Sequence, residues 1–236
     1  MDAVLLKKEG PIGLLTLNRP EKRNALSLDV LSEMLVRLDE VAQDPEIRIV
    51  VLRGEGPVFS AGHDIREMRS HHEDLPYLRR IFATCNQMML RLQGLPQPVI
   101  AQVHGIATAA GCQLVAACDL AIAESGARFA TPGVKIGRFC TTPMVPLVRV
   151  IGRRRAMDML LSGRFISAEE AERFGLVNRI VPVDRLAEEA MKWASELAQS
   201  SAFTLALGKR AFYEQIDMSE GSAYAYAKEV IAMNCL

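Results

Sequence analysis

The sequence predicts an α/β fold whose last third is mostly helical. Up to about residue 142, short β-rich apolar runs alternate with segments in which apolar side chains recur every three or four residues. Strands that alternate with helices are typical of βα units with a largely parallel sheet. With 236 residues, 50% of them hydrophobic, the chain is expected to form one large domain or one domain with an appendage. We divide it into a core at 1–180 and a helical C-terminal region at 181–236.

The N-terminal part contains two strands, a helix and a third strand. The apolar runs 4–8 and 12–18 are separated by a Gly-Pro pair, which favours a hairpin or two successive strands. A helix with apolar side chains at helical spacing follows Ser27, which is placed to cap it, and ends before Pro45. The apolar run 47–52 then predicts a buried strand.

The middle of the chain is predicted to add a long helix and two more strands around a segment of small residues. In order, these elements are the loop 54–62, a helix through 78–92, the strand 99–103, the small-residue segment 105–111, a short helix at 112–117 and the strand 120–123. No formally charged residue occurs from Leu92 to Cys118. Because this stretch contains prolines, a histidine and four glutamines, which would lack partners in lipid, we interpret it as buried core.

The last third is predicted to be helical. Ser167 and Glu170 have the spacing of a capping box, and Gly175 is placed to end that helix. After the apolar run 180–183, helical patterns cover 185–200, 203–216 and 222–233.

Charge, cysteine and histidine patterns exclude several classes of function. Lys and Arg number 28, as do Asp and Glu, so no net charge attracts nucleic acid or an anionic membrane. The five cysteines include no Cys-x-x-Cys pair, and the four histidines have no metal-ligand spacing, so we expect neither a disulfide framework nor a metal site. The first ten residues lack the apolar stretch of a secretory signal, which favours a cytoplasmic location.

Two segments of small residues that follow predicted strands are candidates for chemistry. They span 59–65 and 104–111. Small side chains leave backbone N–H groups accessible, and two such donors, one at a helix N-terminus, can hold a developing oxyanion. The alternative is that small residues only allow tight packing of strands against helices. Neither segment has the glycine spacing of a dinucleotide fingerprint or a phosphate loop.

Several short motifs occur in order along nearly the whole chain. They are Asn18-Arg19-Pro20 with Asn24-Ala25-Leu26, the segment 59–65, the stretch from Val99 to Asp119, Phe129-Ala130-Thr131-Pro132, and Leu161-Ser162-Gly163 with Ala171 and Gly175-Leu176-Val177. Each is weak alone, but their joint order and spacing resemble the crotonase (enoyl-CoA hydratase/isomerase) superfamily.

The resemblance implies a crotonase-type spiral of ββα turns, followed by a helical C-terminal region that builds homotrimers or hexamers. It also implies an acyl-CoA thioester as ligand and a role in fatty acid metabolism, with coenzyme A as part of the substrate and no separate cofactor. The backbone N–H groups of His63 and Ala110 match the family's oxyanion hole. The positions implied to bind or adjoin the substrate are Lys22, Arg23, Ala25, Leu26, Ala61, Asp64, Ile65, Ala109, Pro132, Cys140 and Thr141. For Asp64, a simple helix cap is an equal alternative.

The catalytic positions of the family's hydratases depart from its pattern here. Those enzymes hydrate a conjugated double bond with two glutamates, and the matching residues are Gln113 and Gly133. An amide has no useful basicity near neutral pH, and glycine has no side chain. Residues 134–152 contain no Asp or Glu to replace them. Because general acid–base catalysis typically contributes ~10²–10⁴-fold, we expect hydratase activity to be weak or absent.

Other functions therefore remain open beside the family's hydratase role. One is a CoA-thioester lyase similar to methylmalonyl-CoA decarboxylase, in which thioester polarisation supports decarboxylation and the loop tyrosine corresponds to Cys140. Another is a non-catalytic acyl-CoA-binding regulatory protein. A reaction of the Cys140 thiol is a third, although a free cysteine is more often a packing residue than a nucleophile.

Overall fold

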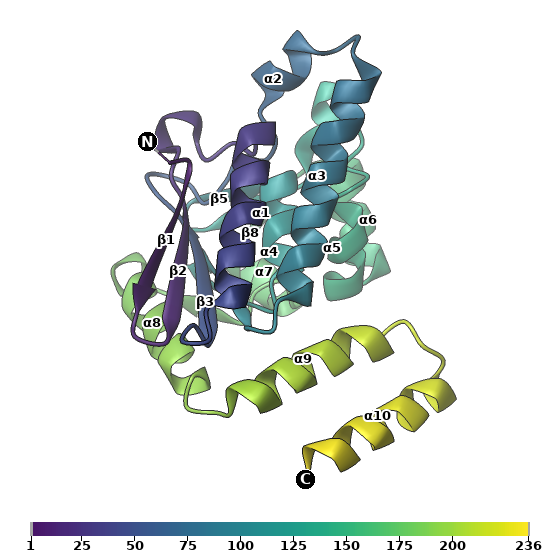
Figure 1. The fold of residues 1–236 in the computed structure, drawn as a ribbon. Helices are drawn as coiled ribbons and strands as arrows, with labels where there is room; N and C mark the ends of the chain where they lie inside the picture. The colour runs from purple at the N-terminus through teal and green to yellow at the C-terminus, as the bar shows by residue number, and fades with distance from the viewer. Residues whose placement is uncertain (1, 236) are drawn as a thin grey trace.

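The computed structural model describes residues 2–235 and is built on a six-stranded sheet (Figure 1). The strand order is β1-β2-β3-β4-β6-β9, and every neighbouring pair is parallel except β1 with β2, which form the predicted antiparallel hairpin. The strands are β1 (Val4–Glu9), β2 (Ile12–Leu17), β3 (Ile49–Gly54), β4 (Val99–Val103), β6 (Leu120–Glu124) and β9 (Arg179–Val181).

A second sheet of three short strands stands beside the first. Its order is β5 (Ile106–Thr108), β7 (Arg128–Ala130), β8 (Ile166–Ser167), with β5 and β7 parallel. Strands of two or three residues carry no readable alternation, which is why the sequence analysis did not predict them. Together, the two sheets and their helices form an α/β fold, as the alternation of strands and helices in the sequence predicted.

Helices cover both faces of the large sheet, which explains why its central strands are continuously apolar. On one face lie α1 (Leu28–Gln43) and α3 (Leu75–Gly94), whose apolar sides pack on alternate residues of the central strands (Figure 1). On the other face, Trp193 of α8 (Leu186–Leu197) packs with Val51 and Ile122. The shorter helices are α2 (Ile65–Ser70), α4 (Ala110–Ala117), α5 (Met144–Ile151), α6 (Arg153–Ser162) and α7 (Ala168–Phe174), with single turns at Pro20–Lys22, Pro132–Ile136 and Val183–Arg185.

Most expected helix ends agree with the structure. The Ser27 side chain accepts from the N–H of Val30, and Ser167 and Glu170 form both bonds of the predicted capping box. The expected short helix begins at Ala110, two residues earlier than predicted. Most of the uncharged stretch 92–118 is interior, since every residue of β4 and α4 is buried, but Gly94 and Pro96 are exposed. Among residues 2–235, no helix is both long and apolar enough to cross a membrane.

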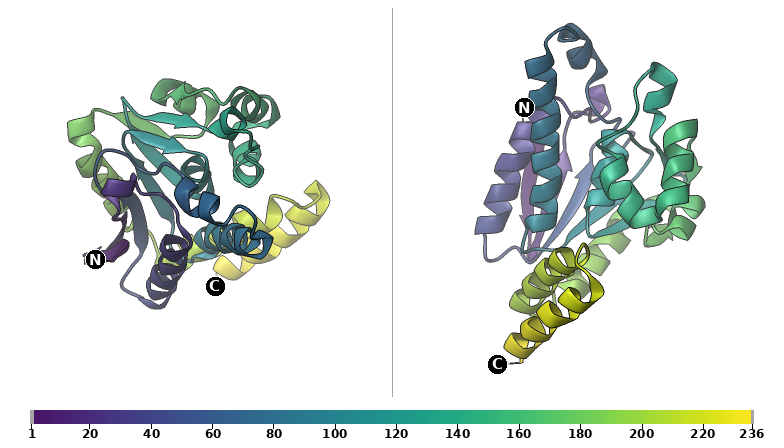
Figure 2. Two further views of the ribbon diagram at one scale, coloured as in Figure 1. Left: turned by 90° about the horizontal axis from the view of Figure 1, so that it is seen from above. Right: turned by 90° about the vertical axis from the view of Figure 1, so that its right-hand side faces the viewer.

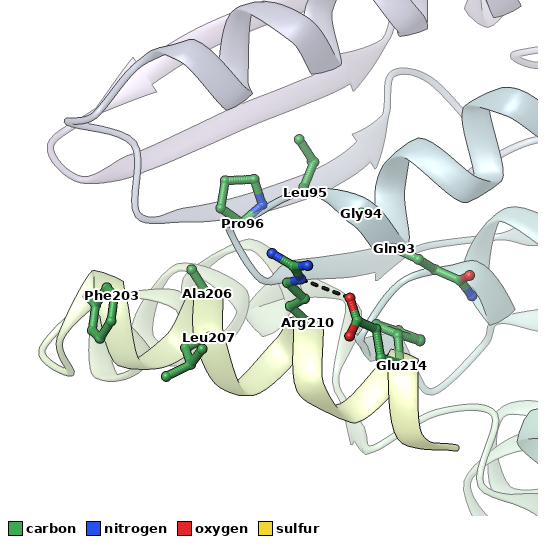
Figure 3. Close-up of a pocket in the computed structure, with 10 residues that line it drawn as sticks. Gln93, Gly94, Leu95, Pro96, Phe203, Ala206, Leu207, Arg210 and Glu214 are labelled. Atoms are coloured by element: carbon green, nitrogen blue, oxygen red, sulfur yellow. Dashed lines mark hydrogen bonds and ion pairs between the residues drawn. The ribbon is translucent and has the colours of Figure 1, made fainter. Parts of the chain in front are cut away.

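The last two helices extend away from the body (Figure 2). They are α9 (Ala202–Gln215) and α10 (Glu220–Asn234), and no residue of either is buried as a whole, although the Lys209 side chain of α9 is only 6% exposed. A groove of about 590 Å³ separates α9 from the end of α3, with Phe203 and Arg210 on its α9 side (Figure 3). The domain boundary that we predicted after residue 180 stays a prediction. The helix α8 follows that point in the sequence, yet it packs on the large sheet.

Buried thiols in the core predict a loss of stability in alkali. Burial raises the pKa of Cys85 and of Cys112 to about 12, from 9.0. The unfolded chain then releases these protons above pH 9 while the folded chain keeps them, so stability falls between pH 9 and about pH 12. At pH 10 each thiol is expected to cost about 1.4 kcal/mol of unfolding free energy relative to pH 8.

Denaturant unfolding at pH 8 and pH 10 measures this loss. Cys85→Ala is expected to reduce the dependence on pH, whereas Cys235→Ala is not, because Cys235 is exposed. Equal unfolding free energies of the unmodified protein at the two pH values would contradict the prediction.

Candidate functional site

The two small-residue segments lie against each other at the edge of the second sheet. The N–H of Ser60 donates to the carbonyl of Ile106 (3.1 Å), and the N–H of Thr108 donates to the carbonyl of Ser60 (3.0 Å). A Cβ added to Gly62 would lie 2.7 Å from the carbonyl oxygen of Thr108 and 3.0 Å from the nitrogen of Ala110. The sequence left tight packing as an alternative to an oxyanion hole. The packing is so tight that position 62 requires glycine, and it also brings together the two segments that contain the predicted N–H donors.

Both backbone N–H groups expected in the oxyanion hole are free to bind a ligand. Ala110 is the first residue of α4, so its N–H has no acceptor within the helix and lies at the positive end of the helix dipole. His63 follows Gly62 directly, and no acceptor for its N–H occurs among residues 2–235. The two N–H groups therefore lie on adjoining backbone segments, and their use as an oxyanion hole stays a prediction.

Ala109 turns the chain into α4 and sets the direction of the Ala110 N–H. Its φ of 50° and ψ of −116° belong to a region that side chains other than glycine rarely adopt. Ala109→Gly is therefore expected to leave the unfolding free energy unchanged or to raise it by up to about 1 kcal/mol. Ala109→Val is expected to lower it by about 1–3 kcal/mol.

Denaturant unfolding of both variants tests this expectation. Ala116→Gly, the same exchange within α4, serves as control and is expected to lose at least about 1 kcal/mol. A loss of that size for Ala109→Gly would show that residue 109 is not strained.

The His63 side chain is held in one tautomer. Its Nδ1 lies 3.2 Å from the carbonyl oxygen of Leu26, which can only accept, so Nδ1 carries the proton. Its ring packs edge-on against Phe82 of α3, with 5.2 Å between ring centroids. Burial lowers the pKa of His63, so the imidazole is neutral at neutral pH, and its buried Nε2 has no partner among residues 2–235.

A cleft of about 1020 Å³ adjoins His63 and contains most of the residues expected to bind the substrate. Of the predicted residues, Lys22, Arg23, Ala25, Ala61, Asp64 and Ile65 line it. Leu26 does not, because its side chain is completely buried. Pro132 lines a neighbouring cavity of about 490 Å³ that shares Arg23 and Ala61 with the cleft. Contact of these residues with a ligand stays a prediction.

Two carboxylates in the cleft hold helix ends. Asp64 accepts from the N–H groups of Arg66 and Glu67, so the helix-cap interpretation of Asp64 is confirmed. Glu67, which the sequence analysis missed, accepts from the N–H of Leu28 through both oxygens (3.2 Å each) and from the Tyr77 hydroxyl (3.1 Å). Glu67 thereby ties α2 to the first turn of α1.

The two positions that match the catalytic glutamates of the family's hydratases, Gln113 and Gly133, are both buried. Gln113 is 3% exposed, and its Oε1 has no partner among residues 2–235. A Cβ on Gly133 would lie 2.6 Å from the carbonyl oxygen of Arg138 and 2.8 Å from Cys140 Sγ. Burial raises the pKa of Cys140, which leaves the thiol protonated and a poor nucleophile. Thr141, the other candidate in this loop, is exposed.

Comparison with known proteins identifies the fold and the family. The fold is the crotonase fold: a crystal structure of enoyl-CoA hydratase from Mycobacterium smegmatis matches with a TM-score of 0.97 at 44% identity, covering 100% of this chain and 92% of that one. That of human enoyl-CoA hydratase domain-containing protein 3 matches with a TM-score of 0.95 at 39% identity, covering 99% and 92%. The sequence matches the enoyl-CoA hydratase/isomerase family over residues 7–233, and the chain belongs to that family.

A curated relative extends the match. Enoyl-CoA hydratase domain-containing protein 3 from Danio rerio is 44% identical over 224 residues, which cover 94% of this chain and 77% of the relative. The relative's name places it in the mitochondrion. The cytoplasmic location that we expect for this chain stays a prediction.

Proposed function

We propose that this protein binds an acyl-CoA thioester in the cleft beside α2 and polarises its carbonyl with the N–H groups of His63 and Ala110. The observation that supports this proposal is the packing of Gly62, the residue before His63, against the start of α4, which places two backbone N–H groups without acceptors on adjoining segments. The basic side chains of Arg19, Lys22 and Arg23 line the same cleft and are suited to the phosphates of coenzyme A.

We do not expect the protein to hydrate a bound enoyl-CoA at ordinary hydratase rates. Gln113 presents an amide instead of a base, and Gly133 has neither a side chain nor the space for one. Decarboxylation needs less acid–base chemistry, but the buried Cys140 thiol is a weak hydrogen-bond donor in place of a tyrosine hydroxyl. Binding and polarisation of a thioester without hydration is the function that fits these residues.

Titration calorimetry with two ligands that differ only at the carbonyl tests the proposal. Acetyl-CoA contains the thioester oxygen, and S-ethyl-CoA, a thioether, lacks it. Two hydrogen bonds to that oxygen are expected to make acetyl-CoA bind at least about tenfold more tightly. Lys22→Ala is the control, since loss of a phosphate contact weakens both ligands equally and leaves their ratio unchanged. Equal affinities in the unmodified protein, or rapid loss of crotonyl-CoA absorbance, would overturn the proposal.

We also propose that the protein forms homotrimers, or hexamers made of two trimers, through its C-terminal helices. Several apolar side chains on α9 and α10 are more than half exposed in the single chain, including Phe203, Phe212 and Ile231. A second copy would remove them from water. Light scattering coupled to size-exclusion chromatography is expected to give three or six times the mass of one chain, and a monomer would contradict this.

A further inference from the structure

The chain segment 26–28, which leads into α1, runs beside the segment 62–67, which contains His63 and the start of α2. At one end, the N–H of Leu26 donates to the carbonyl of Gly62 (2.8 Å). At the other end, the N–H of Leu28 donates to the carboxylate of Glu67 (3.2 Å to each oxygen). The first bond joins two backbone groups, whereas the second depends on a side chain and can be removed by substitution.

The bond at Gly62 sets the direction of the His63 N–H. The carbonyl of Gly62 and the N–H of His63 belong to one planar trans peptide unit, in which the two groups point in opposite directions. Because Leu26 holds the carbonyl on one side, the N–H points to the opposite side, away from Leu26. The position of the segment 26–28 therefore determines where this donor of the predicted oxyanion hole points.

Glu67 holds the two segments together at their other end. The helix α2 has six residues, of which only Met68 is buried, and it projects at one end of the molecule (Figure 1). The Glu67 carboxylate lies at the N-terminus of α1, where the helix dipole favours a negative charge. The Tyr77 hydroxyl donates to Glu67 Oε1 (3.1 Å), so the same carboxylate also binds the start of α3. The place of α2 on α1 therefore depends on Glu67.

The Glu67 carboxylate is suited to hold protein groups and not the ligand. It lines the cleft of about 1020 Å³ in which we propose that acyl-CoA binds, but its negative charge repels the phosphates of coenzyme A. Both of its oxygens already accept from the N–H of Leu28. Any contribution of Glu67 to ligand binding therefore acts through the backbone that it holds.

From this arrangement we propose that Glu67 is a positioning residue for the oxyanion hole. It holds the segment 62–67 against the segment 26–28 and so fixes the peptide unit whose N–H, that of His63, faces the thioester oxygen. The inference rests on the proposed function, since it requires that this oxygen occupies the oxyanion hole. The reach of the side chain to the N–H of Leu28 matters for this role, and its charge does not. A shorter carboxylate should therefore impair the role, and a neutral side chain of the same length should preserve it.

Two substitutions of Glu67 separate reach from charge. Glu67→Asp keeps the charge but withdraws the carboxylate by one methylene, whereas Glu67→Gln keeps the length and one acceptor oxygen without the charge. Titration calorimetry with acetyl-CoA and S-ethyl-CoA measures the preference for the thioester oxygen, which we expect to be at least about tenfold in the unmodified protein. We expect Glu67→Asp to reduce this preference at least about threefold, because one of the two hydrogen bonds to that oxygen loses its alignment. Glu67→Gln is expected to keep the preference.

Glu33→Asp is the matched control for a general loss of stability. Glu33 also accepts from a distant backbone group, the N–H of Ala3 (3.0 Å), 30 residues away, but it is not among the residues that line the cleft. This variant is expected to keep the preference for acetyl-CoA.

Three results would overturn the inference. They are an unchanged preference in Glu67→Asp, a reduced preference in Glu67→Gln, and a reduction in Glu33→Asp as large as that in Glu67→Asp. Equal affinities of the unmodified protein for the two ligands would show that the proposed function is wrong, and the inference would fall with it.

Discussion

Replacing Lys209 by methionine is expected to lower the free energy of unfolding by about 3–5 kcal/mol, because it leaves the buried Asp119 carboxylate without its cation. The Lys209 side chain is 6% exposed, and its Nζ lies 2.7 Å from Asp119 Oδ2. The same ammonium donates to the carbonyls of Leu92 (2.9 Å) and Gln97 (3.0 Å), and the Tyr213 hydroxyl donates to Asp119 Oδ1 (2.9 Å). This ion pair and these hydrogen bonds attach α9 to the end of α3 and to the residues before β4 and β6.

Denaturant unfolding of Lys209→Met with two controls measures this anchor. Arg210→Met removes the next residue's ion pair with Glu214, which is exposed, and is expected to leave the unfolding midpoint nearly unchanged (Figure 3). Lys209→Met combined with Asp119→Asn removes the unpaired charge and is expected to be more stable than Lys209→Met alone. Equal behaviour of Lys209→Met and Arg210→Met would mean that the buried pair does not hold α9.

Adding a side chain at position 133 is the second change with a large expected effect. Gly133→Ala places a Cβ within 2.6 Å of the Arg138 carbonyl and 2.8 Å of Cys140 Sγ. The loop must then move, and we expect a loss of about 1–3 kcal/mol of unfolding free energy. Gly208→Ala is the matched control, because nothing lies within 4 Å of its added Cβ and alanine favours its helix.

The same crowding determines whether hydration can be restored. Glutamates at positions 113 and 133 are the obvious repair from the sequence, because those positions match the catalytic pair of the family's hydratases. The Cβ of a glutamate at position 133 would clash with the carbonyl oxygen of Arg138, so we do not expect its carboxylate to reach the catalytic position. We therefore expect the variant with both Gln113→Glu and Gly133→Glu to leave crotonyl-CoA absorbance unchanged. Hydration by this variant would show that the loop 138–140 yields easily.

Much of the fold could be predicted from local patterns. The helix between Ser27 and Pro45 and the capping box of Ser167 and Glu170 depend on side chains three or four residues apart, so a single sequence contains the whole interaction. The segment 59–65 stood out as part of a candidate site because its composition of small residues is also a local property.

The features that define the site depend on contacts between distant parts of the chain. The Glu67 carboxylate accepts a hydrogen bond from the N–H of Leu28, 39 residues away in the sequence. No local sequence pattern around either residue predicts that bond. The resemblance to the family's hydratases marked Gly133 as the position of a missing carboxylate, but the crowding of this position by Arg138 and Cys140 is visible only in the folded loop. Helical periodicity and capping depend on a few neighbouring residues, so the sequence alone determines them. Contacts between distant segments depend on how the whole chain packs, so only the tertiary structure determines them.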